Sequence, residues 1–165
     1  MRSEIYHLSE LLGRALLKKN ATVTSAESCT GGGVAQAITA VAGSSGWFNR
    51  SYVTYANSAK QEMLGVSEQL LNDCGAVSEA VVLAMAEGAA HGASADYAVA
   101  ISGIAGPDGG TEEKPVGTVW FAWRSPQGTV ARKYLLTGDR ESVREQAVKI
   151  SLQELLHQVT GCNTV

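Results

Sequence analysis

The sequence lacks the features of several large protein classes. Its three cysteines, Cys29, Cys74 and Cys162, show no CxxC spacing, so neither a zinc site nor a disulfide framework is expected. The three histidines are far apart and form no metal-binding motif. Nowhere do about 18 apolar residues follow one another, and the first ten residues hold no apolar run typical of a signal peptide. We therefore expect a metal-free cytoplasmic protein that does not associate with membranes.

The sequence also lacks a large excess of charge of either sign. The sequence holds 13 Lys and Arg residues and 16 Asp and Glu residues, which gives a formal net charge of -3. Basic residues occur as isolated pairs, such as Lys18-Lys19 and Arg132-Lys133, rather than as a stripe, so nucleic-acid binding is not expected. The hydrophobic content of 45% is typical of a globular chain, and we expect residues 1–165 to form a single domain.

The spacing of apolar residues predicts an alternation of helices and strands. The expected helices span residues 4–19, 32–41, 59–64, 67–73, 79–91 and 140–158. The expected strands span residues 21–26, 51–56, 96–102, 117–124 and 129–136. A Ser-Pro-Gln-Gly turn between the last two strands is typical of a hairpin. This order predicts an α/β fold: a three-layer α/β/α sandwich whose mixed sheet includes one antiparallel hairpin.

The turn after the first expected strand is the stretch richest in reactive groups. Glu27, Ser28, Cys29 and Thr30 are followed there by three glycines and a helix. Unpaired N–H groups at a helix N-terminus could bind an anion or the oxyanion of an acyl-transfer reaction, with Ser28 or Cys29 as the nucleophile. The pKa of the Cys29 thiol would fall at this position. Alternatively, Ser28 or Thr30 only caps the helix. Glu27 could act as a base, could hold a substrate hydroxyl or could be a structural carboxylate.

A hydroxyl nucleophile needs a base, and no histidine stands near Ser28 in the sequence. Lys60, just past the next strand, is the better candidate. A free lysine has a pKa of about 10.4, but burial can lower it until the neutral amine accepts a proton. Tyr55, at the end of that strand, could relay a proton or orient the amine. The alternative is that Lys60 is a solvated lysine on a helix surface.

A second candidate site is the long glycine-rich loop 103–117, which follows the strand at 96–102. Its backbone N–H groups could cradle a phosphate or carboxylate, although it matches neither GxxxxGK[ST] nor GxGxxG. If the two preceding strands are parallel neighbours, this loop and the Ser28 turn meet in one crevice. Arg140 and Arg144 of the last helix could reach an anionic ligand there, although arginines on a helix surface are common.

Several longer motifs occur in order along nearly the whole chain: residues 26–32, 53–55 with Lys60, 75–78, 101–110, 114–119 and 138–140. Together they resemble the C-terminal domain family of competence-damage-inducible protein A. The resemblance implies a nicotinamide-nucleotide amidohydrolase (NMN deamidase) of the pyridine nucleotide cycle in NAD metabolism. Such an enzyme hydrolyses the carboxamide of nicotinamide mononucleotide (NMN) to nicotinic acid mononucleotide and ammonia, without a metal or other cofactor.

The resemblance also implies roles for individual residues. Ser28 would be the nucleophile, Lys60 its base and Tyr55 an assisting hydroxyl. Backbone donors near the oxyanion and the groups that hold the rest of the nucleotide would come from Glu27, Thr30, Gly31, Gly32, Ser102, Gly103, Ile104, Ala105, Gly106 and Pro107. One arginine, Arg140 or Arg144, would bind the phosphate.

The alternative function is a catalytically inactive nucleotide-binding or regulatory module with the same fold. In either case the expected partner is a small pyridine nucleotide. We also expect a homo-oligomer, because Trp47, Phe48 and the alanine-rich helix could serve a subunit contact.

Overall fold

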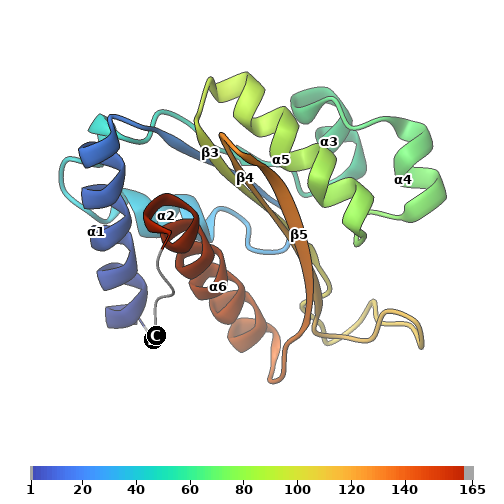
Figure 1. The fold of residues 1–165 in the computed structure, drawn as a ribbon. Coiled ribbons are helices and arrows are strands. Elements are labelled where there is room, and N and C mark those ends of the chain that lie inside the picture. Colours follow the sequence, from blue (N-terminus) through green and yellow to red (C-terminus); the bar gives the residue numbers. More distant parts are fainter. Residues whose placement is uncertain (1, 162–165) are drawn as a thin grey trace.

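One mixed sheet of five strands forms the centre of residues 2–161, the part of the chain that the computed structural model describes. In spatial order the strands are β2 (Tyr52–Val53), β1 (Val23–Glu27), β3 (Tyr97–Gly103), β4 (Thr118–Ser125) and β5 (Gly128–Leu135) (Figure 1). Strand β1 runs parallel to β2 and β3. Strand β4 runs antiparallel to β3 and β5, which confirms the expected hairpin.

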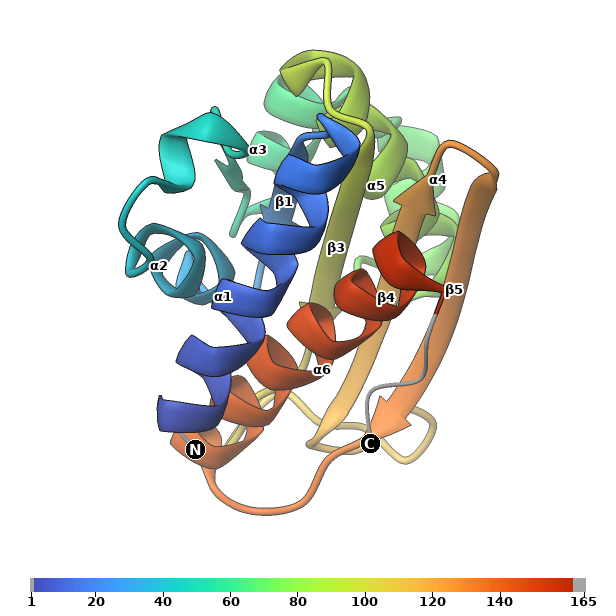
Figure 2. The same cartoon turned by 60° about the vertical axis from the view of Figure 1, so that its left-hand side comes forward.

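Helices cover both faces of this sheet, as Figures 1 and 2 show. One face carries α1 (Arg2–Lys19), α2 (Gly33–Thr39) and α6 (Arg140–Thr160), and the other carries α3 (Asn57–Leu64), α4 (Glu68–Cys74) and α5 (Glu79–Ala93). A short 3-10 turn, Ser44–Gly46, follows α2. The expected three-layer α/β/α sandwich is therefore confirmed. None of the helices within residues 2–161 is long and apolar enough to cross a membrane.

The two hydrophobic cores follow from the period-two alternation of the central strands. In β3, Val99 and Ile101 point into the core beneath α1, α2 and α6, whereas Ala100 points toward α5. All three side chains are fully buried, and each large apolar side chain buried in this way contributes roughly 1.5–3 kcal/mol. The small residue on the α5 side allows that helix to pack closely on the sheet. Trp47 is 2% exposed and belongs to the first core, so its side chain is not available for a subunit contact.

Strand β2 is shorter than the expected strand 51–56. It pairs with β1 only at Ala26 with Tyr52 and at Glu27 with Val53. The next two carbonyl oxygens, those of Thr54 and Tyr55, accept hydrogen bonds from a lysine side chain. The chain thus leaves the sheet here because these carbonyl groups are used by the neighbouring site.

The carboxyl ends of β1 and β3 lie side by side. Glu27 pairs with Ile101, and the N–H of Ser28 donates to the Ile101 carbonyl oxygen at 3.0 Å. This register brings the turn after β1 next to the loop after β3, as expected for two parallel neighbours.

Candidate active site

The centre of the site is a hydrogen bond between Lys60 and Ser28. Lys60 lies on α3 and is 1% exposed, and its Nζ donates to Ser28 Oγ at 3.1 Å. The same amine also donates to the carbonyl oxygens of Thr54 at 2.8 Å and Tyr55 at 3.1 Å. Neither of the two ion pairs formed within residues 2–161 involves Lys60, so no carboxylate there compensates its charge.

This environment changes the acidity of Lys60. Burial lowers its pKa from the ordinary lysine value, because the charged form loses its hydration, and the nearby Cys29 opposes that effect. A lower pKa increases the share of neutral amine, and only the neutral amine can accept a proton. The arrangement therefore supplies a serine hydroxyl with a base at hydrogen-bond distance, the geometry that nucleophilic catalysis requires.

Ser28 and Lys60 open into a cavity of about 280 Å³ at the carboxyl end of the sheet. Its lining residues are Ser28, Cys29, Tyr55, Asn57, Lys60, Ala76, Val77, Ser102, Gly103, Ile104, Ala105, Gly106, Asp108, Gly109 and Arg140. The structure thus brings the Ser28 turn and the glycine-rich loop together, as the sequence predicted.

Two polar lining residues, Asn57 and Asp108, were not singled out by the sequence analysis. Asn57 lies three positions before Lys60 on α3, and residues at this spacing share one face of a helix. That spacing was the signal that could have identified Asn57. Asp108 had no comparable signal, because it lies in the irregular loop.

Arg140 lies at the rim of this cavity together with Tyr55. Its Nη1 donates to the Gly106 carbonyl oxygen at 2.8 Å, and its Nη2 donates to the Tyr55 hydroxyl at 3.1 Å. Tyr55 is 62% exposed, and its hydroxyl contacts Arg140 rather than Ser28 or Lys60. Pro107 follows Gly106 through a cis peptide bond and is not among the lining residues.

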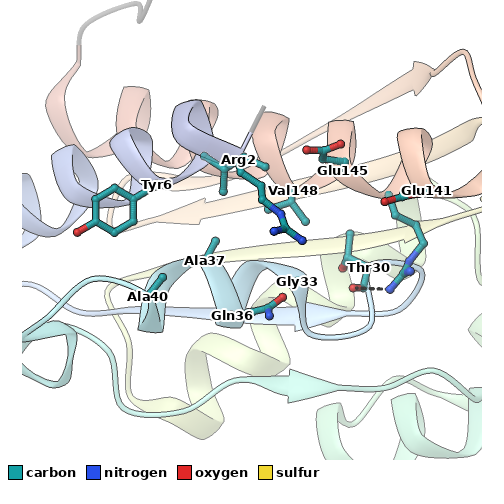
Figure 3. A pocket seen from close by; sticks show the side chains of 12 residues that line it. Arg2, Tyr6, Thr30, Gly33, Gln36, Ala37, Ala40, Glu141, Glu145 and Val148 are labelled. Atoms are coloured by element: carbon teal, nitrogen blue, oxygen red, sulfur yellow. Dashed lines mark hydrogen bonds between the residues drawn. The ribbon is translucent and has the colours of Figure 1, made fainter.

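Arg144 does not reach the cavity. Its Nε donates to the Cys29 carbonyl oxygen at 3.0 Å, and its Nη2 donates to that of Thr30 at 3.4 Å. It lines a different groove, of about 610 Å³, whose walls come from α1, α2 and α6 (Figure 3). Of the two arginines considered, only Arg140 is therefore placed to contact a ligand beside Ser28.

The expected donors Thr30, Gly31 and Gly32 do not line the cavity either. The Gly31 N–H donates to the Ser28 carbonyl oxygen at 3.0 Å, so it closes the turn and is not available to an oxyanion. Gly31 and Gly32 have φ values of 59° and 97°, which explains the choice of glycine at both positions.

Glu27 is fully buried, and its carboxylate is bound to the beginning of α2. Oε1 accepts hydrogen bonds from Thr30 Oγ1 at 2.8 Å and from the Val34 N–H at 2.9 Å. Oε2 accepts from the Ala35 N–H at 3.0 Å and from Ser25 Oγ at 3.0 Å. The carboxylate thus satisfies N–H groups at the helix N-terminus, a favourable place for a negative charge. This geometry supports the structural alternative for Glu27 rather than a contact with substrate.

Cys29 differs from the sequence-based expectation. Its thiol is 6% exposed and belongs to the core, and burial raises its pKa to about 11. The expected fall in pKa was wrong because burial removes the hydration of the thiolate, and the Glu27 carboxylate bound at the start of α2 raises the pKa of the thiol further. A protonated thiol is a poor nucleophile.

Comparisons with known proteins agree with this geometry. Residues 5–159 match the family model described as the CinA C-terminal domain. The chain is 59% identical to "Nicotinamide-nucleotide amidohydrolase PncC" of Escherichia coli K12, over 94% of this chain and 95% of the relative. It is 53% identical to the protein of that name from Pseudomonas putida, over 90% and 93%.

The fold has close structural neighbours as well. A crystal structure of a CinA superfamily protein from Klebsiella pneumoniae superposes with a TM-score of 0.91 at 39% identity, covering 96% of this chain and 99% of that one. The motifs, the fold and the sequence identity over almost the whole length agree: this chain belongs to the CinA C-terminal domain family.

Proposed function

We propose that this protein is a nicotinamide-nucleotide amidohydrolase that converts NMN to nicotinic acid mononucleotide and ammonia in pyridine nucleotide recycling. Relatives of similar length carry that name at 59% and 53% identity. The observation that carries the proposal is the 3.1 Å hydrogen bond between Ser28 Oγ and a buried Lys60 amine that lacks a carboxylate partner among the described residues.

In the first half-reaction, Ser28 is the nucleophile. The neutral Lys60 amine takes the hydroxyl proton while Ser28 Oγ attacks the carboxamide carbon, which gives a tetrahedral intermediate. As the C–N bond breaks, the Lys60 ammonium returns the proton to the leaving nitrogen, and ammonia departs. The nicotinoyl group is then held as an ester on Ser28.

In the second half-reaction, water takes the place of ammonia. Lys60, neutral again, removes a proton from the water as its oxygen attacks the ester carbon. The Ser28–acyl bond breaks, the serine oxygen recovers the proton from Lys60, and the carboxylate product leaves. Lys60 thus serves as base in the attack and as acid in the departure of both leaving groups.

Arg140 is the residue that we assign to the phosphate of the substrate. A guanidinium group has five N–H donors, and Arg140 uses two of its nitrogen atoms for Gly106 and Tyr55, which leaves further donors for an anion. Tyr55 orients this guanidinium through its hydroxyl, and its carbonyl oxygen orients Lys60. The loop residues Ser102–Gly106 form the facing wall.

An ammonia-release assay on purified protein tests this proposal. The substrates are NMN, nicotinamide riboside, which lacks the phosphate, and NAD, with Ser28→Ala as the control protein. We expect turnover of NMN that exceeds turnover of the riboside, and none by Ser28→Ala. Binding of NMN without ammonia release would instead identify a catalytically inactive nucleotide-binding module.

A further inference from the structure

The nucleophile stands at the start of a tight turn whose geometry is well defined. The hydrogen bond from the Gly31 N–H to the Ser28 carbonyl oxygen makes Cys29 and Thr30 the two central residues. Thr30 is not among the non-glycine residues of the described chain that have positive φ, which are Asn20 and Ser94. A type II turn requires positive φ at its second central residue, so this turn is not of type II. The peptide between Cys29 and Thr30 therefore has the orientation opposite to that of the central peptide in a type II turn.

Arg144 holds that central peptide from the α6 side. Its guanidinium donates to the Cys29 carbonyl oxygen at 3.0 Å and to the Thr30 carbonyl oxygen at 3.4 Å, and the second bond is drawn in Figure 3. In a planar trans peptide, the C=O and N–H groups point in opposite directions. Because the Cys29 carbonyl group points at Arg144, the Thr30 N–H of the same peptide points away from α6.

The guanidinium group of Arg144 is hydrogen-bonded to this turn and forms no ion pair within residues 2–161. Although Glu141 and Glu145 line the same groove, neither is ion-paired with Arg144 among the described residues. The group also lies against the turn so closely that a Cβ on Gly31 would be 3.3 Å from Nη2. A planar guanidinium can donate to two adjacent carbonyl oxygens, whereas a lysine amine acts as a point charge.

We propose that Arg144 is a positioning residue for the amidase reaction. It holds the Cys29 and Thr30 carbonyl oxygens of the turn that begins at Ser28, and in this way it keeps Ser28 Oγ within hydrogen-bond distance of Lys60 Nζ. If the turn lost these two bonds and changed its conformation, Ser28 Oγ would move away from the amine that takes its proton. The inference rests on the proposed function, and it assigns Arg144 a role without contact to the substrate phosphate.

Kinetics of Arg144→Met with NMN test this assignment. A misplacement of about 1 Å at a catalytic group can cost about 10²-fold in rate, so we expect kcat to fall by about that factor. KM should stay within about twofold, because ground-state binding is untouched. The matched control is Val148→Ala, which removes packing against Gly33 one turn further along α6 and leaves the turn carbonyls untouched. It should lower the melting temperature without lowering kcat.

Three results would overturn the assignment: an unchanged kcat in Arg144→Met, a rise in KM alone, which would indicate phosphate binding, or an equal loss of kcat in Val148→Ala. If Arg144→Met does not fold, Arg144→Lys carries the same test. Its amine can keep one of the two bonds, and a kcat reduced by roughly tenfold is expected, as for the loss of one hydrogen bond.

A second measurement separates this inference from the proposed function. The Thr30 amide resonance in a ¹H–¹⁵N correlation spectrum reports the orientation of the peptide without any substrate. It should shift in Arg144→Met and stay in place in Val148→Ala. An unshifted resonance in Arg144→Met would overturn the role of Arg144 even if the protein hydrolyses NMN. A shifted resonance in a protein without amidase activity would instead refute the function and leave the geometry intact.

Discussion

The rate of ammonia release should depend on pH through Lys60. An unshifted lysine with a pKa of about 10.4 is neutral in only about 0.04% of molecules at pH 7. Each unit by which burial lowers this pKa raises the competent fraction about tenfold, which corresponds to about 1.4 kcal/mol of differential stabilisation. Lys60 is buried and has no ion pair with a carboxylate within residues 2–161, so loss of hydration of the charged form lowers its pKa.

The assay is kcat/KM for NMN between about pH 6 and pH 10, a range that brackets the lowered pKa and approaches that of free lysine. We expect log kcat/KM to rise by about one per pH unit and to level off below the ordinary lysine pKa. Lys60→Arg keeps a cation that cannot be deprotonated in this range, so it should be inactive at every pH. Lys149→Arg is the matched control, because Lys149 is partly exposed and ion-paired with Glu4. A flat profile, or an active Lys60→Arg, would refute the role of Lys60 as a base.

The same pKa shift has a consequence for stability. Between the lowered pKa and about 10.4, the unfolded state binds a proton at Lys60 that the folded state does not. The free energy of unfolding of the wild type, relative to Lys60→Met, should therefore rise as pH increases through this window. Thermal unfolding of both proteins at about pH 7 and pH 10 measures the difference. A difference that moves in the opposite direction would show that the folded state favours the charged amine.

Three further variants test other parts of the site. Arg140→Met should raise KM for NMN by about 10- to 100-fold, as for a lost charge-assisted hydrogen bond, and leave KM for nicotinamide riboside unchanged; equal effects on both substrates would contradict the phosphate assignment. Glu27→Gln should cost about 2 kcal/mol in urea unfolding, because an amide replaces the carboxylate that accepts four hydrogen bonds; no loss would contradict its structural role. Gly88→Ala would place a Cβ 2.1 Å from the Leu64 carbonyl oxygen at the end of α3, so it should lower both stability and activity, whereas Gly46→Ala, 3.4 Å from its nearest neighbour, should change neither.

The sequence predicted the fold well because the core residues are regularly spaced. Valine and isoleucine in the strand at 96–102 and the apolar stripes of the helices are local signals, and they identify the three layers. Strand β2 was predicted too long because its last carbonyl groups bind Lys60, a contact 5 to 6 residues away along the chain that a strand pattern does not reveal.

The Ser28–Lys60 pair could be predicted because both residues follow neighbouring strands of the sheet. The direction in which individual side chains point could not be predicted. Glu27 and Cys29 flank Ser28, yet one caps α2 and the other enters the core. Arg140 and Arg144 are one helical turn apart, but Arg140 lines the cavity beside Ser28, whereas Arg144 lines the groove between α1, α2 and α6. Such differences depend on tertiary packing rather than on spacing in the sequence.

The central claim is that Ser28, and not its neighbour Cys29, attacks the carboxamide. The most direct test compares ammonia release from NMN by Ser28→Ala and Cys29→Ala, with thermal unfolding to establish that both proteins fold. We predict that Ser28→Ala releases no ammonia above background and that Cys29→Ala keeps most of the wild-type activity, because its thiol is buried with a pKa of about 11. Activity that survives in Ser28→Ala and disappears in Cys29→Ala would contradict this account.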